Sequence, residues 1–362
     1  MKVIQIADLH LGKLFHKTNI IRDQEYMLQQ ILAIMEQQQA NLIIAGDVFD
    51  SANPSLEAQE LFLRTMISVK KLCSTYNKRC WIIVGNHDSN RRLLLWREFL
   101  LPEIDIIDDT RWVDWEGTKL FLMSFIKPVF AQMHFNRFFD SYKEAFKAYI
   151  KDVPDKEHTV LVAHQTFEGC TTGSSETMSF FDDAVPISEV SEFALVLAGH
   201  IHKRQTIQNI TYCGSLLPYA FGDAFSNSVR VWDIDTTNEN FEIGYEDVEV
   251  SCLHNLKIIR GDLNHCLSVP DSNDYIKIEL IEENVDLDVA MNQLKAHFTY
   301  LMNVATKITD IWEADLNKPV EKFSTIEEAV DSFCNQIEIP LFETAQMNLI
   351  KECIYEITKT ED

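Results

Sequence analysis

Residues 41–50 read NLIIAGDVFD, and the same pattern recurs in MKVIQIADLH at residues 1–10 and CWIIVGNHD at residues 80–88. In each stretch a short apolar run is followed at once by Asp, Asn or His. Short apolar runs that end in turn residues are typical of buried β-strands. Stretches with helical spacing of apolar residues lie between them, so the sequence predicts a layered α/β domain.

This alternation extends over residues 1–235. We expect strands at Lys2–Ala7, Leu42–Ala45, Trp81–Val84, Lys119–Phe125, Thr159–Ala163 and Ala194–Ala198. We expect helices at Arg22–Gln38, Ser55–Tyr76, Arg91–Leu100 and Ala131–Ile150. No helix is predicted between Val229–Asp235 and Phe241–Val250, so this region should add β-structure that closes the domain.

The rest of the chain has a different organisation. Leu256–Arg260 and Tyr275–Ile281 alternate like half-buried strands, and a helix is expected at Val289–Leu301. These elements predict a small second domain over residues 236–324. Helical spacing returns in residues 325–362, where the apolar face consists of Phe333, Ile337, Leu341, Phe342, Leu349, Ile350 and Ile354.

Charge and composition limit the class of protein. The net charge is −24, and residues 236–362 hold 9 basic and 26 acidic residues. Nucleic-acid phosphates attract Lys and Arg, so this acidic part should face solvent or a protein partner. The eight cysteines form no CxxC pair and predict reduced, buried thiols. With no signal peptide or membrane span apparent, a cytoplasmic location is expected.

Two more predicted strands end in histidine. His164 ends one strand in LVAHQ, and His200 and His202 follow another in VLAGHIH. Five predicted strands thus end in Asp, Asn or His, and the carboxyl ends of such strands meet at one crevice. Each short motif alone is weak, but their conjunction indicates a shared site. Imidazoles, carboxylates and an amide oxygen suit a pair of octahedral divalent metals.

In this order, DxH, GDxxD, GNHD, the strand-end histidine and GHxH resemble the calcineurin-like metallophosphoesterase superfamily. Within it, IADLHLGK, GDVFDSANPS and LAGHIHKRQTIQNITYCGSLLPYAFGD resemble the bacterial SbcD family. The resemblance implies a β-sandwich flanked by helices as the nuclease domain. It also implies a small α+β capping domain and C-terminal helices that dock a partner ATPase.

The resemblance further implies which residues act. One metal would be held by Asp8, His10, Asp47 and His202, and the other by Asp47, Asn86, His164 and His200. Asp47 would bridge both ions, which are expected to be Mn²⁺. His87 would then face the scissile phosphate as a catalytic residue. Asp50 and Asp88 would either orient the histidines or stabilise turns.

The implied activity is Mn²⁺-dependent exonuclease and endonuclease cleavage of double-stranded DNA ends and hairpins, together with an SbcC-like coiled-coil ATPase. A homodimer within a heterotetramer is also implied, with no membrane partner. Two alternatives stay open: a metallophosphodiesterase or phosphatase that acts on small molecules, and a non-catalytic scaffold. The appended acidic region argues against the first, and the full ligand set argues against the second.

The apolar face of residues 325–362 gives a testable prediction. We expect Phe333, Ile337, Leu349 and Ile354 to bind the base of the ATPase coiled coil. A chain truncated near Ile326 should therefore stay folded and keep Mn²⁺-dependent phosphodiesterase activity, yet fail to pull down the ATPase. Unfolding of the truncated chain, or ATPase binding by it, would contradict this role.

Overall fold

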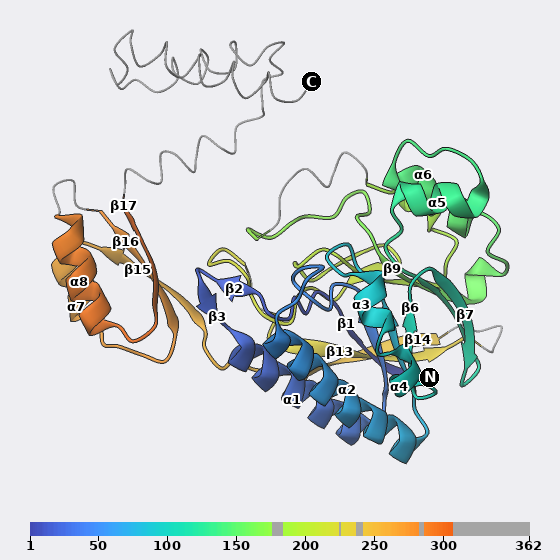
Figure 1. The fold of residues 1–362 in the computed structure, drawn as a ribbon, viewed down its shortest axis with the longest axis horizontal. Helices are drawn as coiled ribbons and strands as arrows, with labels where there is room; N and C mark the ends of the chain where they lie inside the picture. Colours follow the sequence, from blue (N-terminus) through green and yellow to red (C-terminus); the bar gives the residue numbers. More distant parts are fainter. Residues whose placement is uncertain (176–183, 224–225, 237–241, 282–285, 307–362) are drawn as a thin grey trace, which may run out of the picture. The chain divides into compact units, whose positions relative to one another are not determined.

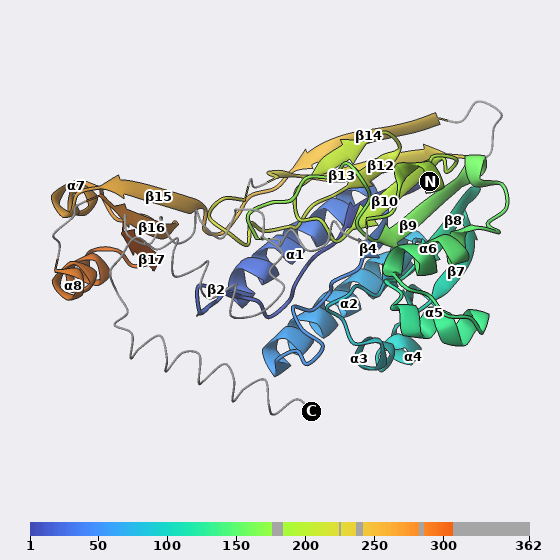
Figure 2. The same ribbon diagram turned by 90° about the horizontal axis from the view of Figure 1, so that it is seen from above.

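The computed structural model describes residues 1–175, 184–223, 226–236, 242–281 and 286–306. Two six-stranded sheets pack face to face (Figures 1 and 2). The first has the order β14 (Glu242–Glu249), β13 (Ser228–Asp235), β1 (Lys2–Ile6), β4 (Asn41–Ala45), β5 (Cys80–Ile83) and β6 (Ile104–Ile107). The second has the order β11 (Gln205–Ile207), β12 (Ile210–Tyr212), β10 (Leu195–Gly199), β9 (Thr159–His164), β8 (Thr118–Met123) and β7 (Thr110–Trp115).

Strand direction determines where the loops gather. β1, β4, β5 and β6 are parallel to one another in the first sheet, and so are β8, β9, β10 and β12 in the second. The carboxyl ends of parallel neighbours meet at one edge of a sheet. The loops that follow β1, β4 and β5 therefore lie together, as do those that follow β9 and β10.

Successive side chains along a strand point to opposite faces of its sheet, and this divides the core into layers. Val3 and Ile43 point into the space between the sheets, where they meet Leu120 and Val160 of the second sheet. Their neighbours in sequence, such as Ile4, Leu42 and Ile44, point to the outer face of the first sheet.

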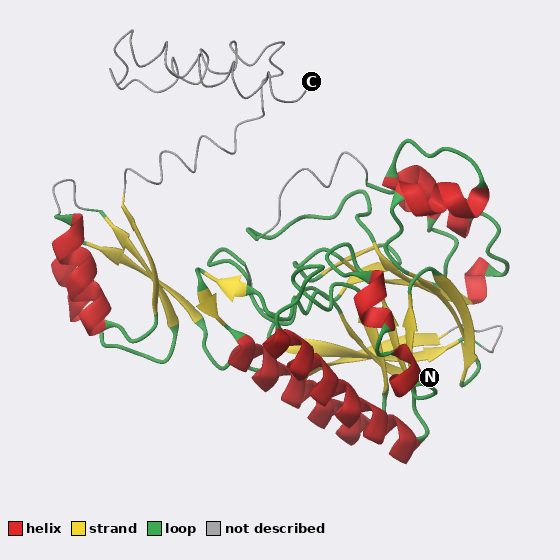
Figure 3. Cartoon of the chain, in the orientation of Figure 1, coloured by secondary structure: helices red, strands yellow, loops and turns green. Residues whose placement is uncertain are grey.

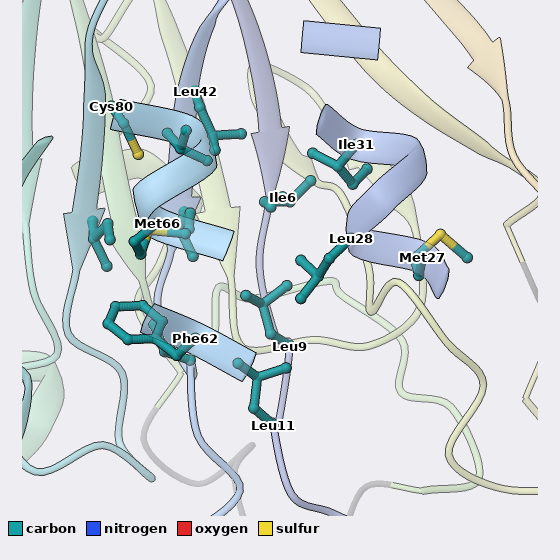
Figure 4. Packing of buried hydrophobic residues seen from close by; sticks show 14 of the residues in the cluster. Ile6, Leu9, Leu11, Met27, Leu28, Ile31, Leu42, Phe62, Met66 and Cys80 are labelled. Atoms are coloured by element: carbon teal, nitrogen blue, oxygen red, sulfur yellow. The ribbon is translucent and has the colours of Figure 1, made fainter. Parts of the chain in front are cut away.

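Helices cover the outer face of each sheet (Figure 3). α1 (Ile21–Gln38) and α2 (Leu56–Tyr76) lie side by side over the first sheet. Figure 4 shows Met27, Leu28 and Ile31 of α1 and Phe62 and Met66 of α2 packed around Ile6 and Leu42. α5 (Pro128–Phe135) and α6 (Tyr142–Ile150) cover the second sheet. The predicted β-sandwich flanked by helices is confirmed.

A separate small core follows the sandwich. It consists of β15 (Leu256–Gly261), α7 (Leu263–Ser268), β16 (Tyr275–Leu280), α8 (Leu287–His297) and β17 (Leu301–Thr306), with strand order β15-β16-β17. Asp23 on α1 links this lobe to the sandwich, because its buried carboxylate accepts a 2.7 Å hydrogen bond from the hydroxyl of Tyr275 and lies 2.7 Å from Nδ1 of His254.

Several predicted boundaries change in the structure. The helix expected at Ala131–Ile150 is two helices, because Asn136 adopts the left-handed conformation that ends α5 and Ser141 caps the start of α6. The helix expected at Arg91–Leu100 is likewise divided into α3 (Asn90–Leu94) and α4 (Arg97–Leu100). α8 ends at His297, and the expected continuation to Leu301 is instead the start of β17.

The expected domain boundary at residue 235 lies inside a hairpin. β13 and β14 pair along their whole length, from Ser228 opposite Glu249 to Asp235 opposite Glu242. The first sheet therefore extends to Glu249. The helices expected in residues 325–362 lie outside the described residues.

No helix among the described residues combines the length and the apolar character needed to cross a bilayer.

Close packing of the two sheets at Gly199 gives a prediction. A Cβ atom there would collide with the backbone oxygen of Ala45 and would lie 2.9 Å from Cβ of Ala7. We expect Gly199→Ala to lower the free energy of unfolding by about 3 kcal/mol, because backbone of the facing sheet cannot move aside cheaply. Gly244→Ala is the matched control, since no atom lies within 4 Å of its added Cβ. Equal melting temperatures for the two variants would contradict this account.

Candidate metal centre

The structure brings the predicted site residues together at the ends of five strands. They are Asp8 and His10 after β1, Asp47 after β4, Asn86 and His87 after β5, His164 at the end of β9, and His200 and His202 after β10. Backbone hydrogen bonds join the first two loops, since the N–H groups of Asp8 and His10 donate to the carbonyls of Gly46 and Asp47. The site is thus formed by segments almost 200 residues apart in sequence.

The ligand atoms form two groups around Asp47. Asp8, His10 and His202 make one group, and Asp47, His164 and His200 make another, each with its atoms within 4.8 Å of one another. A third set with the same spacing, His10, Asp47 and His87, shares a residue with each of them. Oδ2 of Asp47 lies 3.4 Å from Nε2 of His164 and 3.8 Å from Nε2 of His10. A single carboxylate oxygen therefore faces both groups.

The second group has the donor chemistry of a metal site. Nδ1 of His164 lies 2.8 Å from the carbonyl of Ala45 and must donate a hydrogen to it. In the neutral ring Nε2 then has no hydrogen, yet it lies 2.9 Å from Oδ1 of Asn86. His200 places Nδ1 2.9 Å from the same oxygen. A proton on these ring nitrogens makes each contact a hydrogen bond to Oδ1 of Asn86, and without that proton the lone pairs converge on one point, so these residues fit a bound metal ion.

In the first group, two ring nitrogens likewise face each other. Nε2 of His10 and Nε2 of His202 are 3.0 Å apart. Nδ1 of His202 lies 2.9 Å from the hydroxyl of Ser175, and Nδ1 of His10 lies 3.3 Å from a carboxylate oxygen of Asp50. With the hydrogen on Nδ1 of each ring, both Nε2 lone pairs point to the space between the two rings. Adjacent ligands of an octahedral ion with bonds of about 2.1 Å are roughly 3 Å apart, which matches this spacing.

The proton affinities reflect crowding around Asp47. Burial opposes ionisation of Asp47, but His164, His10 and His87 hold its pKa well below its ordinary value. Burial also opposes protonation of His164, and the Asp47 carboxylate overcomes this and raises the pKa of His164 to about 9. Burial and neighbouring histidines lower the pKa of His200 and of His202 to about 3. A metal ion held by His164 would displace the proton that Asp47 draws onto this ring.

His87 and Asp50 are placed differently from the buried histidines around Asp47. His87 is partly exposed, with Nδ1 2.9 Å from the carbonyl of Asp50 and Nε2 4.0 Å from Oδ2 of Asp47. Asp50 uses its carboxylate for His10 and for an ion pair of 2.8 Å with Lys13. Through its carboxylate and its carbonyl, Asp50 therefore contacts two of the histidines, as expected of a residue that orients them.

Asp88 is held by backbone groups. Its buried carboxylate accepts hydrogen bonds from the N–H groups of Val48, Phe49 and Gly85, at 2.9 to 3.2 Å. Burial, followed by the charge of Asp47, raises the pKa of Asp88 to about 6. Of the two roles expected for Asp88, the geometry supports the turn-stabilising one.

The backbone is held in unusual conformations around the ligands. Asp8, His10, Asp47 and His200 all have positive φ, between 42° and 96°. Such conformations cost free energy for residues other than glycine and persist only where the surroundings fix them. Gly46, with φ 90°, also leaves the space that the ring of His164 occupies. Glycine at position 46 thus allows the end of β4 to lie directly against the ring of His164.

Sequence reasoning missed three residues that support the centre. Ser175 contacts His202. Tyr219 donates a 2.6 Å hydrogen bond to the carbonyl of Leu9, and its ring meets those of His10 and His202 edge-on. Gln24 donates to the carbonyl of His10 at 2.8 Å. Tyr219 lies in the GSLLPYAFGD stretch at residues 214–223, which was the one signal that could have identified it.

The hydrogen bonds of Asp88 give a prediction that distinguishes a residue that stabilises the loops from a metal ligand. Asp88→Asn replaces one of the two acceptor oxygens with an NH2 group, which cannot accept from backbone N–H groups. We expect the free energy of unfolding to fall by about 3 kcal/mol even in the presence of a chelator. Asp114→Asn, on the exposed side of β7, is the control and should leave it unchanged. Loss of stability only when metal is present would indicate a ligand role instead.

Comparisons with known proteins identify a family and several related proteins. The family model of the calcineurin-like phosphoesterases matches residues 1–204. The chain is 29% identical to the SbcD component of the SbcCD nuclease of Staphylococcus epidermidis, over 84% of this chain and 86% of that protein. It is 25% identical to the same component from Staphylococcus saprophyticus, over 97% of each. An archaeal phosphodiesterase of known structure has a TM-score of 0.34 and 16% identity, over 68% of this chain and all of that one.

The predicted resemblance to the SbcD family is confirmed by these relatives. More than half of the sequence matches the family model, and the described strands end in the residues that can bind metal. This chain belongs to the calcineurin-like phosphoesterase family, whose members use divalent metal ions.

Proposed function

We propose that this chain is a nuclease that hydrolyses DNA phosphodiesters with two metal ions and works with an SbcC-like ATPase. The observation that carries the proposal is the shared carboxylate of Asp47, which faces both groups of buried histidines. Two ions bound on either side of one carboxylate are characteristic of phosphoryl-transfer sites. The relatives named as parts of the SbcCD nuclease support DNA as the substrate.

The proposed ligands follow the two groups. Asp8, His10, Asp47 and His202 would hold one ion, and Asp47, Asn86, His164 and His200 would hold the other. Mn²⁺ suits this mixture of nitrogen and oxygen donors without cysteine. When bound, two such ions activate water for attack on phosphorus and neutralise charge on the phosphoryl oxygens.

His87 is proposed to act on the leaving group. The carbonyl of Asp50 accepts the hydrogen on Nδ1, so an added proton resides on Nε2. Nε2 is on the side of the ring nearer Asp47, and the side chain is 40% exposed, so a phosphate can reach it. His87 would donate this proton to the leaving oxygen or stabilise the charge that develops there.

The substitutions His87→Ala and Asp47→Ala separate these roles. We expect His87→Ala to abolish cleavage of linear duplex DNA while two Mn²⁺ ions per chain remain bound in a calorimetric titration. Asp47→Ala should lose binding of both ions, because it faces both groups. Loss of an ion in His87→Ala would place His87 among the ligands.

An assay tests the substrate and the partner together. The full chain with Mn²⁺ should cut linear duplex and hairpin DNA, and an SbcC-like ATPase should increase the rate in the presence of ATP. Hydrolysis of a small phosphodiester such as bis(p-nitrophenyl) phosphate, with no cleavage of DNA under either condition, would instead favour a small-molecule phosphodiesterase.

A further inference from the structure

Asp223 forms a junction between two loops beside the metal centre. Its Oδ1 accepts hydrogen bonds from the N–H groups of Ser174 at 2.7 Å and Ser175 at 3.1 Å. Its Oδ2 accepts from the N–H groups of Tyr219 at 3.1 Å and Ala220 at 2.9 Å. One carboxylate therefore joins the segment that follows β9 to the segment that follows β12.

Each joined loop carries a side chain that contacts the His10–His202 group. Ser175 places its hydroxyl 2.9 Å from Nδ1 of His202. Tyr219 is buried, bonds the carbonyl of Leu9, and lies edge-on to the rings of His10 and His202 at 5.4 and 5.6 Å. Both loops that Asp223 holds thus reach the same pair of histidines.

We propose that Asp223 is a positioning residue for the metal ion that His10 and His202 hold. The bonds to Ser174 and Ser175 fix the serine hydroxyl against Nδ1 of His202, and this contact keeps the Nε2 lone pair directed at the ion. The bonds to Tyr219 and Ala220 fix the tyrosine that packs against both rings. This inference rests on the metal assignment proposed above.

Both oxygens of Asp223 act as acceptors, since each of the four partners is a backbone N–H donor. Asn at this position keeps the shape but turns one oxygen into an amide that repels two of the donors. The loops would separate on that side, and the effect would reach one metal ion and not the other. Outer contacts of this kind typically change metal affinity by about 10- to 100-fold.

The test uses the full chain with Mn²⁺ as the only added ligand. Binding is followed by calorimetric titration and by electron paramagnetic resonance, which distinguishes a spin-coupled pair of Mn²⁺ ions from a single ion. The wild-type chain should bind two ions and give the pair spectrum. Asp223→Asn should bind one of them about 10- to 100-fold more weakly and give the single-ion spectrum until Mn²⁺ is raised.

Other variants show which of the two metal ions Asp223 affects. His202→Ala should give the same single-ion spectrum, and Ser175→Ala should weaken the same ion to a smaller degree. Adding Ser175→Ala to Asp223→Asn should cause no further loss, because both act through one contact. Asp233→Asn, on the exposed side of β13, is the control and should bind as the wild type does.

The outcomes are distinct. Two ions bound by Asp223→Asn with wild-type affinity would overturn the proposal, as would equal weakening of both ions. If Asp223→Asn does not fold, Ser175→Ala decides alone, and unchanged binding by that variant overturns the proposal. A wild-type chain that never gives the pair spectrum would contradict the proposed function itself.

Discussion

Asp47 is a carboxylate with almost no access to solvent, and three histidine rings surround it within 4.0 Å. Moving such a charge out of water is costly unless positive charge compensates it. In the chain alone, a proton on His164 supplies this charge, and divalent ions would supply more of it. The buried strand ends, the positive φ angles and the glycine turns all serve to bring these groups together despite their tendency to repel or to hydrate.

The loops that hold the ligands are stabilised by a second set of polar residues. Asp88 joins the loops after β4 and β5, Gln24 bonds the loop after β1, and Asp223 joins the loops after β9 and β12. Buried loops need partners for their backbone groups, which a strand or helix would find within itself. These residues therefore give loops the rigidity that a metal site requires.

Much of this arrangement could be predicted from the sequence. The strands before Asp8, Asp47, Asn86, His164 and His200 follow from apolar runs that end in polar residues, and their convergence follows from parallel strand order. The pairing of ligands into two groups came from family resemblance, because spacing along the chain does not encode distances across two sheets. Ser175 was beyond reach, since an ordinary serine reveals its partners only after folding, and Asp223 had the same signal as Tyr219, because it ends the GSLLPYAFGD stretch.

The prediction of a single helix at residues 131–150 was wrong for a local reason. Apolar spacing runs through residues 131–150 without a break, so periodicity alone predicts one helix, while Ser141 followed by Glu144 is a capping signal that divides it. The order of the ligands along the chain has a different consequence, which concerns synthesis. The ribosome makes Asp8 first and His200 and His202 last, one from each ligand group. If these groups hold the metal ions as proposed, a product released before residue 200 would lack a donor in both, and incomplete chains would be expected to have no hydrolytic activity without any separate inhibitor.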